Sequence, residues 1–200
     1  MRRSPSASRF SLEIGPLTAE RWGDLEDLFG SRGACGGCWC MWWRLRRSEF
    51  ESKKGAGNRR AFKRIVSTGQ CPGLLGYVGG RPVAWLALAP RECYSALGRS
   101  RILKPVDDQP VWSVTCFFVA KDYRRKGVTV RMLKEAVRYV RERGGTVLEG
   151  YPIEPRQGDS PDVFMYVGLA SAFTRAGFKE VTRRSPTRPI MRRYIGRRGR

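Results

Sequence analysis

The chain has 200 residues, 41% of them hydrophobic, and its lysines and arginines exceed its acids to give a net charge of +21. This length suffices for one domain with a sizeable core, and no apolar run approaches the roughly 20 residues of a membrane-spanning helix. The chain contains no histidine, which excludes histidine general bases, Ser–His or Cys–His catalytic pairs and mixed Cys/His zinc sites.

The N-terminal part predicts a tail, a strand and a helix. Residues 1–9 are basic and carry no apolar stretch, so we expect a disordered tail instead of a secretory signal, and hence a cytoplasmic protein. Residues 10–14 alternate between apolar and polar side chains, which is typical of a strand. Residues 18–30 predict a helix, with Thr18 as its N-cap and Gly30 at its end.

The next segment concentrates cysteine and tryptophan. Cys35, Cys38 and Cys40 lie in a glycine-rich loop over residues 31–40. A tetrahedral zinc site needs four ligands, and without a second Cys-x-x-Cys pair or any histidine we expect no metal. A redox role and the packing of small apolar side chains both stay open for these thiols. The tryptophans here either line an acceptor pocket or pack in the core. They are Trp39, Trp42 and Trp43.

The middle of the chain predicts a helix and a hairpin. Residues 58–68 carry their apolar side chains on one helical face. Two apolar runs, residues 74–78 and 82–88, flank the dipeptide Gly79-Gly80. Apolar runs separated by a glycine pair are typical of a β-hairpin.

A strand, a short basic turn and a helix then follow a polar connection. Residues 91–108 show no clear period, whereas residues 111–119 are rich in β-branched and aromatic side chains, the composition of a buried strand. Residues 128–143 have apolar side chains at helical spacing. A turn between strand and helix points backbone N–H groups at one spot, and the helix dipole adds positive potential there. The sequence therefore predicts a phosphate-binding turn.

The C-terminal part continues this alternation. We expect a buried strand at residues 147–151, a loop at 152–161, a helix at 167–176, strands at 178–182 and 189–195, and a basic tail at 196–200. The order of elements predicts one α/β domain over residues 10–195, with no internal boundary.

The basic turn reads Arg124, Arg125, Lys126, Gly127, Val128, Thr129. It resembles the acetyl-coenzyme A signature of the GNAT acetyltransferase superfamily, although the family prefers Gly or Ala where Thr129 stands. The segment 172–178, which ends in Gly-Phe, resembles a later helix of the family. The resemblance implies a GNAT-like fold, a mixed, mostly antiparallel sheet flanked by helices. It also implies an acceptor side in residues 10–110 and an acetyl-coenzyme A side in residues 111–195.

The resemblance further implies acetyl-coenzyme A as cofactor and an N-acetyltransferase acting on an amine of a small molecule or protein by direct attack on the thioester. In relatives, backbone groups of the central strand pair with the pantetheine arm, and here they belong to Phe117 and Val119. The strand positions that often carry a base are Ser113 and Thr115, and the usual proton-donor position is Phe173. None of these three side chains is an acid or a base near neutral pH.

Acid–base chemistry must then come from other side chains. Glu149, in the expected strand after the long helix, is our candidate base, acting through a water held by Ser113 or Thr115. The alternative is a carboxylate that pairs with one of the many arginines. Tyr166 and Tyr151 are fallback proton donors.

Other functions stay open. The empty acid–base positions also fit a non-catalytic module that binds an acyl-coenzyme A, or a metal or redox sensor built on the cysteines. The charge of +21 is spread along the chain without a basic helix or repeat, which favours a solvated basic surface over nucleic-acid binding. We expect neither a membrane nor a specific nucleic acid as partner. The sequence leaves the acceptor and the oligomeric state open.

Overall fold

The computed structural model describes residues 10–155 and 166–196. The tail expected at residues 1–9 lies outside this range, and so do residues 197–200 of the expected C-terminal tail and residues 156–161 of the expected loop. Within the two described stretches, no helix has both the length and the apolar character that crossing a bilayer requires.

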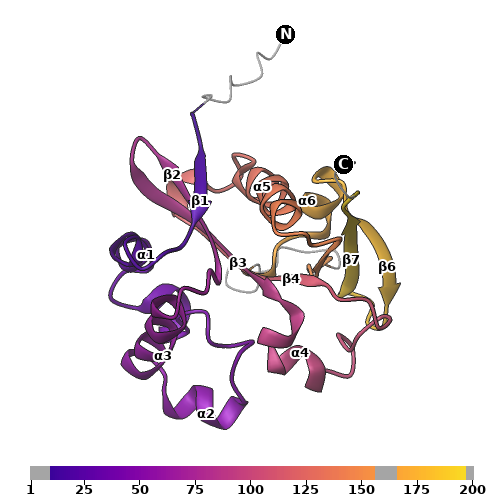
Figure 1. Ribbon diagram of the computed structural model, residues 1–200, viewed down its shortest axis with the longest axis horizontal. Helices are drawn as coiled ribbons and strands as arrows, with labels where there is room; N and C mark the ends of the chain where they lie inside the picture. Colours follow the sequence, from indigo (N-terminus) through magenta and orange to yellow (C-terminus); the bar gives the residue numbers. More distant parts are fainter. Residues whose placement is uncertain (1–9, 156–165, 197–200) are drawn as a thin grey trace.

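A seven-stranded sheet runs through the molecule, with the strand order β1-β2-β3-β4-β5-β7-β6 (Figure 1). Every neighbouring pair is antiparallel except β4 and β5, which run parallel. The chain makes this parallel step through the helix α5, as a parallel connection requires. The strands are β1 (Glu13–Pro16), β2 (Gly73–Val78), β3 (Arg81–Pro90), β4 (Trp112–Val119), β5 (Val147–Gly150), β6 (Lys179–Arg183) and β7 (Pro189–Tyr194).

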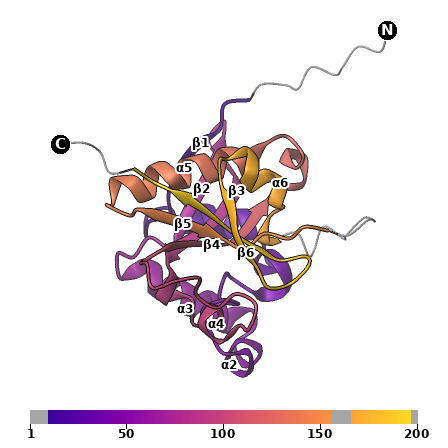
Figure 2. The same ribbon diagram turned by 90° about the vertical axis from the view of Figure 1, so that its right-hand side faces the viewer.

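Helices lie on both sides of the sheet (Figure 2). One side, which we call the α5 face, carries α5 (Val128–Glu142) and α6 (Ala170–Arg175). The other side, the α1 face, carries α1 (Trp22–Phe29), α2 (Arg47–Ser52), α3 (Ala56–Ser67) and α4 (Ser95–Arg99). A separate hydrophobic core fills each side: Leu133 belongs to the core under α5, and Phe62 to the core under α1 and α3.

The strongest sequence patterns are confirmed. The hairpin of β2 and β3 turns at the expected glycine pair, and α3 and α5 lie within two residues of their expected bounds. In α5 the apolar stripe that the sequence predicts is buried, because it packs on the sheet. The mixed, mostly antiparallel sheet with flanking helices is the predicted fold class.

Weaker patterns misplace or miss elements. The sequence does not predict α2 or α4, because each is short and buries a single residue, Phe50 and Leu97 respectively. The first strand is present, but its expected bounds of 10–14 are shifted, since pairing with β2 sets β1 three residues later. The helix expected from Thr18 begins at Trp22 instead, without a side-chain cap.

Candidate active site

Strand β4 extends beyond its pairing with β5, and this opens a gap in the sheet. The parallel ladder ends at Val114, whereas β4 continues to Val119. The N–H group that follows Val119 donates to the carbonyl oxygen of Val83 in β3 at 2.9 Å. Backbone groups alternate in direction along a strand, so those of Val119, and of Phe117 two residues earlier, face away from β3. The two residues expected to bind a cofactor arm thus border the gap.

A β-bulge in β4 turns two consecutive side chains toward the α1 face. Cys116 pairs with Ala87 of β3. Val114 pairs with the next β3 residue, Leu88, so Thr115 is an extra residue on the bulged strand. Cys116 packs against the core of the α1 face, whereas Val114 packs under α5. The bulge therefore lies where β5 leaves β4 and presents Thr115 and Cys116 beside the gap.

The chain leaves β4 through an exposed basic turn. Gly127 is the N-cap of α5 with a φ of 79°, and Arg125 also has a positive φ, 59°. The first N–H groups of a helix have no carbonyl one turn earlier, so they point out of the N-terminus, where the dipole favours an anion. Arg124 donates from Nε to the carbonyl oxygen of Val119 at 3.0 Å, which holds the turn against the strand end. The side chains of Arg125 and Lys126 are exposed.

The last residues of the predicted motif lie in the first turn of α5. Val128 is buried in the core of the α5 face, and Thr129 is half-buried beside it. A Cβ built on Gly127 meets no atom within 4 Å, so the left-handed backbone, and not crowding within the protein, favours glycine there. The turn is therefore open to a ligand from outside.

Glu149 is buried on the α1 face, where three side chains hold its carboxylate. Its Oε1 accepts hydrogen bonds from Arg91 at 2.9 Å and from the Tyr151 hydroxyl at 2.6 Å. Its Oε2 accepts from Nε of Arg192 at 2.7 Å. The Ser113 hydroxyl lies 2.8 Å from that of Tyr151. The structure thus connects Ser113 to Glu149 through Tyr151, and the arginine pairing that the sequence left open is present as well.

Two buried tyrosines lie on this face. Burial, and next to it the charge of Glu149, raises the pKa of Tyr151 well above its ordinary value. Burial also raises the pKa of Tyr94 to about 12. The Tyr94 hydroxyl lies near Thr115 but has no hydrogen-bond partner of good geometry among the described residues. Sequence reasoning misses Tyr94 because it belongs to the aperiodic connection of residues 91–108, where no pattern marks it.

The usual proton-donor position holds a core side chain. Phe173 is fully buried on the α5 face. Its ring meets those of Phe117 and Phe178 edge to face, with centroids 6.0 and 5.1 Å apart. It lies across the sheet from Glu149 and has no proton to give, so its contribution is packing.

Tyr166 lies in the segment before α6, and the groups that act on it electrostatically include thiols of the cysteine loop, the name we give to residues 31–40. Its side chain is half-buried, and burial raises its pKa. The other groups that act on it electrostatically are Arg188, Cys116, Cys38 and Cys35. The fold thus gathers segments that are far apart in the sequence, which no local pattern could predict.

Two of the three thiols of the cysteine loop are at least partly buried, those of Cys38 and Cys40, whereas that of Cys35 is exposed. The indole N–H of Trp85 donates to Sγ of Cys40 at 2.8 Å, and the Cys38 thiol donates to the carbonyl oxygen of Gly33 at 3.7 Å. Burial raises the pKa of Cys38 to about 11 and that of Cys40 well above its ordinary value. Both thiols are therefore protonated at neutral pH and weakly reactive. Across the part of the chain that the structure describes, no three His, Cys, Asp or Glu side chains cluster as metal ligands.

The three tryptophans take different positions. Trp39 is only 5% exposed and packs in the core against Trp22 and Phe29, at centroid distances of 6.1 and 5.6 Å. Trp42 and Trp43 line an open cavity of about 280 Å³ next to α4. The other residues around this cavity are Leu45, Arg47, Ala96, Arg99 and Ser100.

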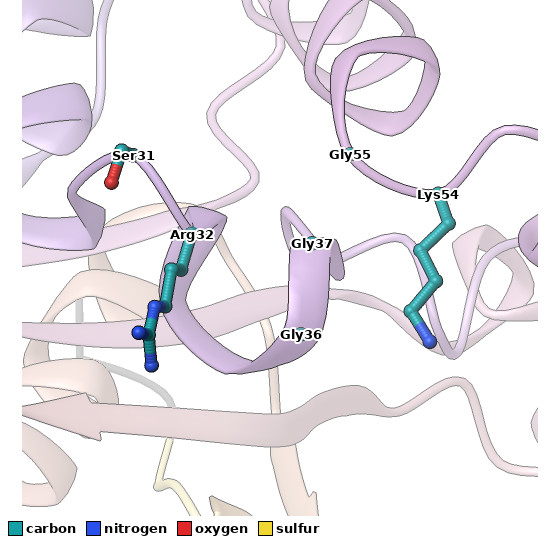
Figure 3. A pocket seen from close by; sticks show the side chains of 6 residues that line it. All are labelled: Ser31, Arg32, Gly36, Gly37, Lys54 and Gly55. Atoms are coloured by element: carbon teal, nitrogen blue, oxygen red, sulfur yellow. The ribbon is translucent and has the colours of Figure 1, made fainter.

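A second open cavity, of about 320 Å³, lies beside the cysteine loop (Figure 3). The side chains of Arg32 and Lys54 stand on its two sides. A Cβ on Gly37 would lie 2.7 Å from the backbone nitrogen of Gly55, so the absence of a side chain lets the loop pack on the start of α3. The cavity is lined by Ser31, Arg32, Gly36, Gly37, Lys54 and Gly55.

Known structures share this architecture. The chain is similar to the PaiA N-acetyltransferase of Thermoplasma acidophilum in complex with coenzyme A, at 17% identity and a TM-score of 0.51, over 92% of this chain and 99% of that one. An acetyltransferase of the GNAT family from Listeria monocytogenes aligns at 9% identity and a TM-score of 0.58, over 95% and 98% of the two chains. A GNAT acetyltransferase from Streptococcus agalactiae aligns at 13% identity and a TM-score of 0.55, over 94% and 99%.

At these identities the structural likeness concerns the fold. No curated protein matches the sequence significantly. The sequence model of the acetyltransferase (GNAT) family does match residues 39–152, more than half of the chain. This match includes β4, the bulge and the basic turn. The chain therefore belongs to the GNAT family of acetyltransferases.

Proposed function

We propose that the protein is an N-acetyltransferase that moves the acetyl group of acetyl-coenzyme A to an amine of a small molecule or a protein, by direct attack on the thioester. The observation that carries this proposal is the gap between β4 and β5, which ends at the basic turn. An extended, amide-bearing arm suits an unpaired strand edge, and a diphosphate suits the N-terminus of a helix.

Acetyl-coenzyme A presents both groups. We assign the pantetheine amides to the backbone of Phe117 and Val119, and the pyrophosphate to the N–H groups of residues 125–129. The exposed side chains of Arg125 and Lys126 add charge beside the phosphates. This arrangement directs the thioester toward the bulge, where a backbone N–H group can stabilise the developing oxyanion.

The chain from Ser113 through Tyr151 to Glu149 suits removal of a proton from the attacking amine. The Tyr151 hydroxyl donates to Glu149, and the Ser113 hydroxyl is within hydrogen-bond distance of Tyr151. When the amine gives a proton to Ser113, each hydroxyl passes its own proton on, and Glu149 accepts the last one. Arg91 and Arg192 donate to the two carboxylate oxygens and so fix the position of Glu149 beside Tyr151.

Tyr166 suits the opposite transfer, protonation of the thiolate that leaves. Its raised pKa keeps the phenol protonated, so that it has a proton to donate. Residues 10–110 would then provide most of the acceptor side, with Trp42 and Trp43 as an aromatic wall, and residues 111–195 the cofactor side. Trp39 packs in the core against Trp22 and Phe29 instead.

Two measurements test the proposal. Isothermal titration calorimetry with acetyl-coenzyme A should show one site per chain, and release of free thiol should rise when a suitable amine is added. Binding without amine-dependent release would favour the non-catalytic acyl-coenzyme A module instead. Absence of binding would refute both functions.

A further inference from the structure

Arg188 lies at the end of the gap, on the α1 face. It directly precedes β7, in which Ile190 packs with Tyr94 and Tyr151. Side chains two residues apart share a face of a strand, so Arg188 points to the side that carries Ile190. Its guanidinium donates from Nη2 to the carbonyl oxygen of Tyr151 at 3.1 Å, just past the end of β5.

Among the residues that the structure describes, the half-buried guanidinium of Arg188 has no acidic partner. Its Nε is buried and makes no hydrogen bond within the described part of the chain, and burial lowers its pKa. The neighbouring arginines of this face are satisfied: Arg91 binds Glu149. Arg192 binds Glu149 and, through two hydrogen bonds, Asp107. A desolvated cation without a counter-charge is unfavourable, which indicates that a bound anion completes this site.

Arg188 lies close to the proposed site of acetyl transfer. Its guanidinium donates to the backbone of Tyr151, and the Tyr151 hydroxyl lies 2.8 Å from that of Ser113 on β4. No carboxylate is among the described groups that act on Tyr166 or on Arg188. An anion held by Arg188 would thus leave the rest of a small molecule within reach of the bulge.

We propose that the acceptor is an amine that also carries a carboxylate, and that Arg188 binds this carboxylate while the amine points to the bulge. The inference rests on the acetyl transfer proposed above. A guanidinium offers a planar fork of donors that matches a carboxylate and discriminates against a carboxamide. The basic turn would then bind the phosphates of the cofactor, and Arg188 would bind the carboxylate of the acceptor, on either side of the gap.

Matched acceptors test this directly. The proteinogenic amino acids, β-alanine and 4-aminobenzoate are each compared with their carboxamides, with thiol release from acetyl-coenzyme A as the readout. For the accepted compounds we expect kcat/KM to be about 100-fold higher for the acid than for its amide, the scale of lost charge-assisted hydrogen bonds. Equal kcat/KM for acid and amide would overturn the inference and leave acetyl transfer intact.

Variants assign the effect to Arg188. In Arg188→Met, kcat/KM for the acid should fall about 100-fold, while that for the amide changes less than about 3-fold, because only the acid loses a partner. Arg188→Lys keeps the charge without the fork and should restore part of the loss. The matched control is Arg193→Met: Arg193 is exposed on β7 and bonds Gly177, so both substrates should keep their rates. Equal losses for acid and amide in Arg188→Met would refute a binding role.

A binding measurement keeps the test independent of turnover. The accepted acid should raise the Tm of the coenzyme A-loaded protein, its amide should not, and Arg188→Met should abolish the rise. If thiol release occurs only with amines that lack a carboxylate, or if none of the acids is acetylated or raises the Tm, the inference fails. Thiol release with amines that lack a carboxylate would leave the proposed acetyltransferase function intact. A failure to bind acetyl-coenzyme A would refute that function separately.

Discussion

The ring of Phe173 occupies the space that a side chain on Gly150 would need: a Cβ built on Gly150 would lie 2.1 Å from Cε1 of the ring. Gly150 is the last residue of β5 and pairs with Val114, where the ladder to β4 ends. The helix α6 therefore closes the gap on the α5 face with an aromatic ring, and only glycine allows this closure.

Replacing Gly150 by alanine should destabilise the protein. The added methyl group forces the ring of Phe173 out of its position, and overpacking of this kind costs about 1–3 kcal/mol. Urea denaturation at neutral pH measures the loss. Gly98→Ala in α4 is the control, since a Cβ there meets nothing within 4 Å, and it should change stability little or raise it. Equal stability of the two variants would contradict the close contact.

Phe173 should matter for stability and little for chemistry. Phe173→Leu removes two ring–ring contacts and should cost about 1–2 kcal/mol. Turnover of the folded variant should fall by less than about 10-fold, because no proton is lost, and Phe173→Tyr should equal or exceed the wild type. A loss of more than about 100-fold with the fold intact, judged by circular dichroism, would reveal a catalytic role for this ring.

Gly127→Val should weaken binding of acetyl-coenzyme A by more than about 10-fold, because valine does not tolerate the left-handed backbone that directs the N–H groups of the turn. The control is Gly144→Val at the opposite end of α5, where φ is 75° and a Cβ likewise meets nothing within 4 Å. Both variants should lose similar stability, and only Gly127→Val should lose affinity in calorimetry. If the two variants bound acetyl-coenzyme A with similar affinity, the turn at Gly127 would not be the phosphate-binding site.

Tyr151→Phe breaks the link between Ser113 and Glu149. We expect kcat to fall about 100-fold or more, the scale of lost proton transfer, with the Kd of acetyl-coenzyme A unchanged. Tyr77→Phe is the control, since its hydroxyl also donates to a carboxylate, that of Asp24 at 2.7 Å, but on β2. If both variants keep full kcat, the proton path does not run through Tyr151.

Tyr94→Phe should change how the free energy of unfolding depends on pH in the alkaline range. The pKa of Tyr94 is raised from 10.0 to about 12 in the folded protein, so the folded state holds the proton more tightly. This stabilisation is complete below pH 10 and is lost as pH rises through 12, a change of about 2–3 kcal/mol. The phenylalanine variant should therefore lose less stability over this range.

At neutral pH the same substitution should cost less than about 1 kcal/mol, because it removes a buried hydroxyl without a good partner. Denaturation curves at pH 7, 10 and 12 measure both effects. A variant that loses as much stability as the wild type above pH 10 would show that Tyr94 titrates normally.

The sequence predicts the strand, turn and helix around residues 124–129 well, because their determinants are local. Residues 124–129 follow one another in the chain, and the flanking strand and helix have strong periodic patterns. The backbone directions of Phe117 and Val119 then follow from the alternation of β4. The matching strand end and helix start confirm this part of the fold.

The contacts around Tyr151 and Arg188 are hard to predict because they join distant segments. Tyr151 reaches Ser113 across a parallel ladder, and Arg188 reaches the end of β5 from the far hairpin. Nothing around Arg188 in the sequence distinguishes it from the other arginines. The role proposed for it depends on the lack of a counter-charge among the described residues, which only three-dimensional packing reveals.

The short ladder between β4 and β5 also affects the mechanics of the sheet. This ladder has three residue pairs, so the sheet consists of two parts, β1-β2-β3-β4 and β5-β7-β6, joined along a short contact. The cysteine loop lies on the side of the first part, and Arg188 precedes β7 of the second. A small rotation of one part relative to the other would change the distance between these two groups, and a molecule bound in the gap would contact both parts and restrict that rotation. Occupancy of the gap and rigidity of the whole sheet are therefore coupled.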